Sequence, residues 1–253
     1  MFLLNCISNE KGLHEMGKEI NNYFENIDDS HKAYWLGFLW ADGYVWKRIR
    51  SGRGAEYGLK LDLSSVDYDI LVQFKKDLNI PTDIKSYAPY KRGFQTVNGT
   101  CRCSYYNKTM VSILMDKYGI VPHRTDVMPL LKQIPIVYEK DFIRGVLDAD
   151  GSFTHYQTID CGVLRDKFLV NFGGTSELMY FIWLHLKTHS IIHSAEMPQL
   201  YKRHPERDGC YYDLKLCGKK QTKSILHYLY DDAEIYLPRK YQKYKNIQNI
   251  LDN

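Results

Sequence analysis

Two aspartates, Asp42 and Asp150, stand in matching surroundings 108 residues apart, each immediately before a glycine. They belong to the heptapeptides Gly37-Phe-Leu-Trp-Ala-Asp-Gly43 and Gly145-Val-Leu-Asp-Ala-Asp-Gly151, which agree at five of seven positions. Two nearby carboxylates repel unless one is protonated or a cation lies between them. A hard divalent cation such as Mg²⁺ prefers oxygen ligands and can activate water against a phosphodiester. The repeat therefore predicts a two-carboxylate metal site suited to phosphate chemistry.

Each aspartate follows an apolar run that predicts a helix. The first helix is expected to begin near Asp29 or Ser30, and the second shortly after Pro135. A single Asp-Gly at such a place is usually a turn or a helix end. A negative charge at a helix C-terminus interacts unfavourably with the helix dipole. Two such unfavourable charges at equivalent places indicate a functional site, because departures from local preferences concentrate at such sites.

Both predicted helices have small residues spaced four apart, at positions 37 and 41 and at positions 145 and 149. Pairs of this kind let two helix backbones approach closely. Packed about a pseudo-twofold axis, the helices are expected to bring Asp42 and Asp150 side by side at one end.

The similarity between the two parts of the chain continues downstream. Asn107-Lys108 matches Gly218-Lys219, and Val121-Pro122-His123-Arg124 matches Leu237-Pro238-Arg239-Lys240, at offsets of 111 and 116. Periodicity predicts strands at 44–50, 58–63, 152–157 and 213–216, and helices at 69–78, 110–118, 178–188 and 222–230. The chain is expected to be α+β, with a helical extension at 1–28 and two similar halves at 29–135 and 136–253.

The composition is that of a globular protein, with 253 residues, 44% apolar residues, 25% charged residues and a net charge of +4. Intrinsic disorder is thereby disfavoured. The longest uncharged apolar run has nine residues, too few for a membrane span, and the first residues do not resemble a signal peptide. We therefore expect an intracellular protein without a membrane partner. The six cysteines form no CxxC pair, which argues against a structural zinc site.

Positive charge gathers in two segments that contain no acid, residues 44–54 and 235–250. Both interleave basic with aromatic residues, a mixture typical of a surface that meets phosphates and bases. The expected partner is a nucleic acid.

The segments Trp35-Leu-Gly-Phe-Leu-Trp-Ala-Asp-Gly43 and Ile143-Arg-Gly-Val-Leu-Asp-Ala-Asp-Gly151 resemble the two motifs of a single-chain LAGLIDADG homing endonuclease. The resemblance spans nearly the whole chain from about residue 30. It implies two pseudo-symmetric αββαββα halves, motif helices at their interface, and two antiparallel sheets that form a DNA-binding saddle. It also implies a monomer that cuts both strands of a long asymmetric DNA site and leaves short 3′ overhangs. The implied cofactor is Mg²⁺, with Mn²⁺ as an alternative and Ca²⁺ as a non-cleaving substitute.

The resemblance assigns roles to four residues. Asp42 and Asp150 match the metal-binding acid of each motif, and Arg124 and Lys240 are the best match for a basic residue near each active site. A backbone ligand at position 41, equivalent to a glycine, is left unassigned.

The two motif copies differ at their sixth position, which is Trp40 in the first copy and Asp148 in the second. Asp148 is therefore not counted as a ligand.

The strand after each motif is expected to point alternate side chains into the major groove, where base edges are read. Neighbouring strands and one loop add further candidates. The DNA-contact candidates are Trp46, Arg48, Arg50, Lys60, Asp62, Thr154, Tyr156, Arg203, Asp213 and Lys215, with Tyr201, Lys202, His204 and Arg207 in the loop of Arg203.

Two alternatives remain open at this point. One is an RNA maturase that acts on intron RNA, or a DNA-binding relative that does not cleave, on the same scaffold. The other is a two-lobed aspartic protease, which also pairs two aspartates. That class needs Asp-Thr/Ser-Gly on β-rich lobes, whereas here alanine precedes each aspartate in a helical segment.

Overall fold

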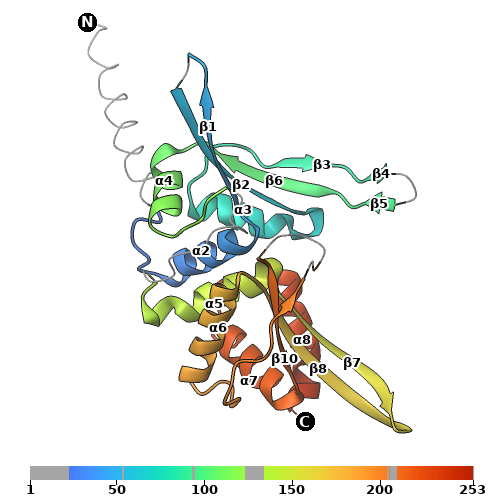
Figure 1. The fold of residues 1–253 in the computed structure, drawn as a ribbon. Coiled ribbons are helices and arrows are strands. Elements are labelled where there is room, and N and C mark those ends of the chain that lie inside the picture. Colours follow the sequence, from blue (N-terminus) through green and yellow to red (C-terminus); the bar gives the residue numbers. More distant parts are fainter. Residues whose placement is uncertain are drawn as a thin grey trace, which may run out of the picture.

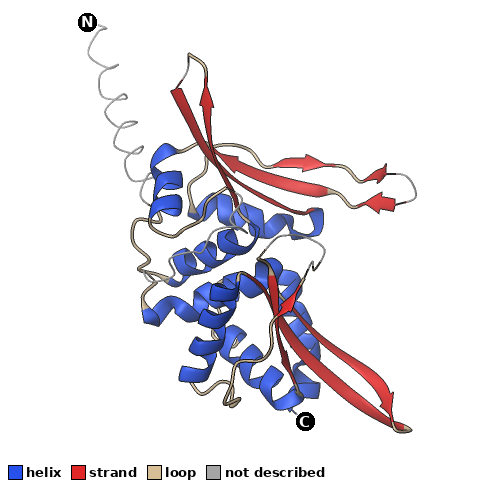
Figure 2. Ribbon diagram, in the orientation of Figure 1, coloured by secondary structure: helices blue, strands red, loops and turns tan. Residues whose placement is uncertain are grey.

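The computed structural model describes residues 23–52, 54–92, 95–122, 134–203, 205 and 210–252. Its elements form two sets of helices and strands that meet along one pair of helices, α2 (Ser30–Asp42) and α5 (Glu139–Asp150) (Figure 1). Helices gather around this pair, and the strands form a sheet in each half (Figure 2). The predicted α+β class is confirmed.

The first half continues from α2 through one four-stranded antiparallel sheet in the order β1-β2-β6-β3. After α2, its elements are β1 (Tyr44–Arg50), β2 (Gly54–Ser64), a short 3₁₀ turn η2 (Ser65–Asp67), α3 (Tyr68–Asp77), β3 (Lys85–Tyr87), β6 (Thr100–Tyr105) and α4 (Lys108–Asp116). A separate hairpin of β4 (Tyr90–Arg92) and β5 (Gln95–Val97) lies beyond β3 and β6 (Figure 1).

The second half repeats this order in the sheet β7-β8-β10-β9. Its elements are the 3₁₀ turn η5 (Ile136–Tyr138), α5, β7 (Ser152–Asp160), β8 (Val163–Gly174), α6 (Ser176–Thr188), β9 (Tyr201–Lys202), β10 (Tyr212–Cys217), α7 (Lys219–Tyr230) and α8 (Pro238–Asp252). Each half is thus αββαββα, as predicted, and α8 is an addition to the second. The strand predicted at 213–216 corresponds to β6 in the first half and not to β2, which it resembles in sequence.

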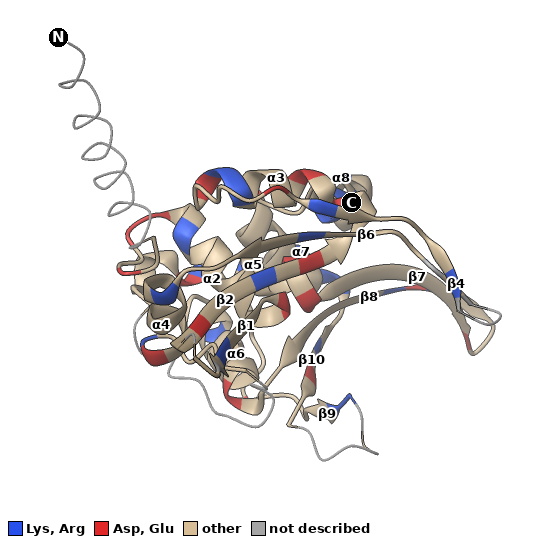
Figure 3. Cartoon of the chain, turned by 90° about the horizontal axis from the view of Figure 1, so that it is seen from above, with Lys and Arg blue, Asp and Glu red and all other residues tan. Residues whose placement is uncertain are grey.

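Alternation of side chains places one face of each sheet on the helical core. Leu59, Leu61 and Leu63 of β2 are buried, as are Phe168, Val170 and Phe172 of β8. Burial of these side chains is the main stabilising contribution, and it leaves the intervening residues on the opposite face. Viewed from above, β7 and β8 form a long curved ribbon that projects past the helices (Figure 3).

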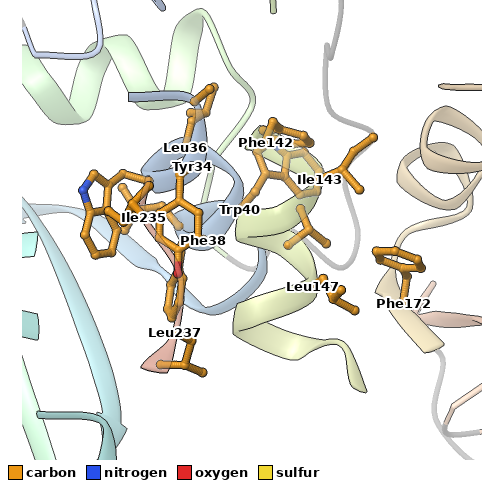
Figure 4. Close-up of a cluster of buried hydrophobic side chains, with 14 of the residues drawn as sticks. Tyr34, Leu36, Phe38, Trp40, Phe142, Ile143, Leu147, Phe172, Ile235 and Leu237 are labelled. Carbon is orange, nitrogen blue, oxygen red and sulfur yellow. The ribbon is translucent and has the colours of Figure 1, made fainter. Parts of the chain in front are cut away.

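The two motif helices pack backbone against backbone. A Cβ atom added to Gly37 would lie 2.0 Å from the carbonyl oxygen of Phe142, and one added to Gly145 would lie 2.1 Å from that of Tyr34. Around this crossing, Phe38 of α2 and Leu147 of α5 join a buried apolar cluster (Figure 4). The close approach predicted from the small residues is confirmed.

Side-chain caps begin several helices where the sequence supplies them. Asp29 accepts a hydrogen bond from the backbone N–H of Lys32 at 2.7 Å, and Asn107 accepts one from Met110 at 2.9 Å. These bonds satisfy N–H groups that have no partner within the helix. The predicted N-terminal extension lies largely in residues 1–22, outside the described residues. In the part of the chain that the structure describes, no helix has the length and apolar character to span a bilayer.

Candidate active site

Asp42 and Asp150 are the last residues of α2 and α5. Each lies five residues beyond the glycine at which the helices cross. The crossing therefore places both carboxylates at equivalent ends of the helix pair. Asp42 is exposed, and the side chain of Asp150 is 30% exposed, so both can be reached from outside.

The glycine after each aspartate turns the chain directly from helix into strand. Gly43 and Gly151 have extended backbones, and their N–H groups donate to Leu39 and Leu147 at 2.9 and 3.1 Å. A Cβ atom would lie 2.6 Å from the Leu39 oxygen at position 43 and 2.8 Å from the Leu147 oxygen at position 151. Glycine is required here for close approach and not for a left-handed conformation. The result is that β1 and β7 begin directly beside the carboxylates.

The residue before the first aspartate is Ala41, at the position where the backbone ligand equivalent to a glycine was left unassigned. Ala41 is half-buried near the end of α2 and lines a small pocket together with Gly173 and Tyr211 of the second half. The methyl group of Ala41 packs against the apolar core. This packing concerns the side chain alone, so a backbone ligand at position 41 stays an unassigned prediction.

Lys240, at the start of α8, binds the end of the second motif helix. Its ammonium donates to the carbonyl oxygens of Leu147, Asp148 and Gly151 at 2.6, 2.8 and 2.6 Å. Burial lowers the pKa of Lys240 to about 8, against the opposing effect of Asp148, Asp42 and Asp150. Because Asp42 and Asp150 both act on this pKa, the ammonium lies within electrostatic reach of both candidate metal ligands. Arg124, its predicted counterpart, lies outside the described residues.

Replacing Lys240 with methionine is expected to reduce the free energy of unfolding by about 2 kcal/mol, because the carbonyl groups at the end of α5 lose their charged donor. Urea denaturation of both proteins measures the change. Lys243→Met is the matched control on the same helix, since it leaves the three bonds of Lys240 in place. An equal loss in the two variants would show that the carbonyl bonds contribute nothing.

A basic pocket of about 390 Å³ opens beside Asp150. It is lined by Ala149, Asp150, Gly151, Ser152, Phe153, Arg239, Lys240 and Lys243. Arg239 is fixed there by Asp67 of the first half, at 2.7 and 2.9 Å, and Lys243 lies over the ring of Phe153. Burial, with the charge of Arg239 as a second cause, lowers the pKa of Lys243. Arg239 and Lys243 were not predicted as site residues, although both belong to the basic segment 235–250.

Asp150 has two further neighbours. Nη1 of Arg203 lies 3.0 and 3.2 Å from the two carboxylate oxygens of Asp150, and the Tyr211 hydroxyl also donates to this carboxylate. Arg203 was predicted to contact DNA, which stays a prediction; the structure places its guanidinium on the candidate metal ligand. Tyr211 was missed, because no local pattern connects it with residue 150. His204 and Arg207 lie outside the described residues.

Asp148 faces the interior between the two halves. It is completely buried and accepts hydrogen bonds from Tyr34 at 3.0 Å, Tyr230 at 2.5 Å and the backbone N–H of Leu237 at 2.7 Å. Burial raises the pKa of Asp148, although Lys240 and these donors oppose the shift. Its partners make Asp148 a link between the helices, in agreement with its exclusion from the ligands.

The outward face of the first sheet carries the predicted polar side chains. In the pairing of β1 with β2, Tyr44 lies opposite Lys60 and Arg48 lies opposite Glu56. Asp62 forms ion pairs with Lys60 and Arg102. Trp46, predicted to contact DNA, is largely covered, and its contact with DNA stays a prediction. The residue is 7% exposed, and its ring fills the space that a side chain at Gly58 would need. Arg50 ends β1, but its side chain is outside the described part of the structure.

The outward face of the second sheet also carries polar and charged side chains. Thr154 and Tyr156 of β7 lie there, since the alternate residue Phe153 is buried. Asp213 and Lys215 of β10 also face outward, because Leu214 and Leu216, which alternate with them, are buried. Two cations of β8 on this face were missed, Arg165 and Lys167, which pair in register with Thr158 and Tyr156. The strand pattern of 163–174 carries the signal that would have found them.

The donor set fits a hard divalent cation that retains water. Among the described residues, no group of three or more His, Cys, Asp and Glu side chains could enclose a metal. Carboxylates contributed singly from two helices do not make a tetrahedral zinc cage. They match Mg²⁺, which is commonly bound by one or two carboxylates together with waters and substrate phosphates.

No protein-family model matches this chain, and no curated protein matches it. Solved structures do match its fold. The meganuclease I-CpaMI bound to uncleaved DNA is 11% identical with a TM-score of 0.60, over 87% of this chain and 90% of that chain. I-GzeII in complex with its DNA target is 12% identical with a TM-score of 0.56, over 87% and 89%. I-SmaMI, bound to an uncleaved DNA target in the presence of calcium ions, is 12% identical with a TM-score of 0.56, over 87% and 91%. With its paired motif helices and two four-stranded sheets, the chain therefore has the fold of the single-chain LAGLIDADG homing endonucleases.

Proposed function

We propose that this protein is a site-specific endonuclease that hydrolyses both strands of a long double-stranded DNA site with a divalent metal. The observation that carries the proposal is the placement of Asp42 and Asp150 at equivalent ends of two crossed helices, with Lys240 in electrostatic reach of both. The DNA-bound state of the structural neighbours supports DNA as the substrate. Because one chain supplies both carboxylates, we propose that a monomer is sufficient.

Asp42 and Asp150 would hold the divalent cation, for which we propose Mg²⁺, and the calcium ions present with I-SmaMI support a divalent metal. When bound, such a cation supplies an activated water and stabilises the leaving oxygen. Lys240 keeps the end of α5 in place and contributes positive charge near both carboxylates. Arg239 and Lys243 make the pocket beside Asp150 suitable for an anionic phosphate. The outward faces of the two sheets would orient the duplex over these groups.

The two halves should read different half-sites, because their first strands present different side chains on the outward face. Arg48 lies over the Trp46 ring, with its guanidinium carbon 5.8 Å from the ring centre, so the side chain is held for contact with a base edge. The second sheet presents Thr154 and Tyr156 on its first strand instead. An asymmetric target follows from this difference.

Replacing Arg48 with alanine is expected to weaken binding by about 1–3 kcal/mol and to relax sequence preference in one half-site only. The measurement is binding of the variant to duplexes altered in one half-site at a time. Thr154→Ala provides the comparison in the other half. Equal effects of Arg48→Ala on both half-sites would contradict the two-half arrangement.

The function itself is tested by incubating the purified protein with a library of randomised duplexes, with Mg²⁺ and separately with EDTA, and sequencing the ends produced. We expect Mg²⁺-dependent cuts with one 3′ overhang at a single long asymmetric sequence. Absence of any enriched cut would count against cleavage of DNA. The intron-RNA maturase or the non-cleaving DNA-binding protein would then be the next function to test.

A further inference from the structure

Arg203 is held between two carboxylates in the second half. Its Nε and Nη2 donate to Oδ1 of Asp213 at 3.0 and 2.7 Å, while Nη1 donates to both oxygens of Asp150. The guanidinium thus uses its planar fork to join a sheet residue to the last residue of the motif helix. Two N–H groups that converge on one Asp213 oxygen fix the orientation of the guanidinium plane, and the charge on both partners strengthens these hydrogen bonds.

The space above Gly173, where the second sheet has no side chain, accommodates this guanidinium. Gly173 of β8 lies opposite Asp213, and a Cβ atom at position 173 would lie 2.3 Å from Nη2 of Arg203 and 2.9 Å from the Tyr211 hydroxyl. The centre of the Tyr211 ring lies 4.6 Å from the Arg203 guanidinium carbon. The backbone N–H of Arg203 donates to the backbone carbonyl oxygen of Tyr211 at 3.0 Å. Arg203 occupies this position because residue 173 has no side chain.

The first half has a different arrangement at the matching place. Lys60 and Asn171 pair with the first residue of the strand that follows each motif. Two residues further on, the first sheet has Asp62 paired with Arg102, where the second has Gly173 paired with Asp213. Arg102 is bound by Asp62 within its own sheet. The space above Gly173 is therefore a feature of the second half and not of the repeated unit.

We propose that Arg203 is a positioning residue that competes with the divalent cation for Asp150 and so weakens cation binding at that carboxylate. This inference rests on the proposed function, because it takes Asp150 as a metal ligand. Both Asp150 oxygens accept from Nη1, so a cation that approaches them is repelled by the guanidinium charge and finds part of each oxygen's accepting capacity already used. The side chains of Arg203 and Asp150 are 28% and 30% exposed, so water screens the pair and the competition is moderate.

The test measures Mn²⁺ binding to the purified full-length protein without DNA, by electron paramagnetic resonance of the unbound ion. In Arg203→Ala, the Mn²⁺ concentration that half-saturates the Asp150-dependent site should fall about three- to fivefold. Gly173→Ala should produce a similar fall, because the new methyl group displaces the guanidinium tip while its charge is retained. Lys223→Ala removes one positive charge from α7, where Lys223 pairs with Asp252, and should cause no change.

Asp150→Asn distinguishes a failure of Asp150 as a metal ligand from a failure of the competition by Arg203. If Asp150→Asn leaves Mn²⁺ binding intact, the metal assignment in the proposed function is wrong. If Asp150→Asn removes a site whose affinity is unchanged or weaker in Arg203→Ala and Gly173→Ala, only the competition by Arg203 is wrong. Should either variant fail to fold, Arg203→Lys replaces it. Lysine keeps the charge but has no fork to join both carboxylates, so the same tightening is expected and its absence overturns the proposal.

Discussion

We expect Asp42→Asn and Asp150→Asn each to reduce double-strand cleavage by about a thousandfold while DNA binding is retained. Asparagine keeps the shape of the side chain but removes the negative charge that a divalent cation requires at the end of each motif helix. Losses of two to three orders of magnitude are usual when one electrostatic contribution to a transition state is removed. The measurement is the rate of linear product from a plasmid carrying the target site, together with a binding assay on the same duplex.

The control for this experiment is Asp83→Asn, which removes the same charge from a side chain that is 99% exposed and paired with Lys75. Its cleavage rate should equal that of the wild type. Full cleavage by both Asp42→Asn and Asp150→Asn would refute the metal-site assignment. Nicked product from either variant would identify the strand that depends on the altered carboxylate.

Gly145→Ala is expected to lower the free energy of unfolding by about 3 kcal/mol, and Gly37→Ala by a similar amount. The added methyl carbon would lie 2.1 Å from the Tyr34 carbonyl oxygen at position 145 and 2.0 Å from the Phe142 oxygen at position 37. Both obstacles are backbone atoms, so the two helices must separate and the core between them must repack. For a chain of this size the loss corresponds to a fall in Tm of roughly 6–12 °C, which calorimetry measures.

Gly162→Ala is the control for the general cost of replacing glycine. Gly162 has a φ of +78° in the turn between β7 and β8, and no atom lies within 4 Å of the added methyl group. Alanine at this position should lower the free energy of unfolding by only about 1 kcal/mol, because an L side chain disfavours the left-handed backbone conformation. A loss in Gly145→Ala no greater than in Gly162→Ala would mean that the motif helices are not in backbone contact. Separation of the helices should also reduce cleavage, since it moves Asp42 relative to Asp150.

Much of the fold could be predicted because its signals are local. The apolar run before each Asp-Gly predicted both motif helices, and the structure ends them at Asp42 and Asp150. Small residues at positions 37 and 145 predicted the crossing, since close approach depends on side-chain size alone. Element boundaries were less accurate. The strand predicted at 152–157 continues to residue 160, because its antiparallel partner β8 supplies hydrogen bonds beyond the apolar pattern.

The candidate site was predicted only where a residue carries a repeated motif. Asp42, Asp150 and Lys240 belong to matched segments, and the structure brings their charges into mutual reach. The burial of Trp46 was not predicted, because it depends on the residue opposite: Gly58 has no side chain, and the indole ring fills that space. An isolated strand pattern does not show which outward residue is covered in this way.

By itself, the sequence of this protein determined two similar halves, the helices that join them, and a carboxylate at the end of each. These features follow from periodicity, residue size and repetition, which act over a few neighbouring positions. Only the tertiary structure decided that Arg203 binds Asp150, that Arg239 binds Asp67 across the halves, and that Lys240 donates to the end of α5. These contacts join residues 53 to 172 positions apart. The folded chain brings such residues together through the packing of its sheets and helices, and no local pattern records which partner each will meet.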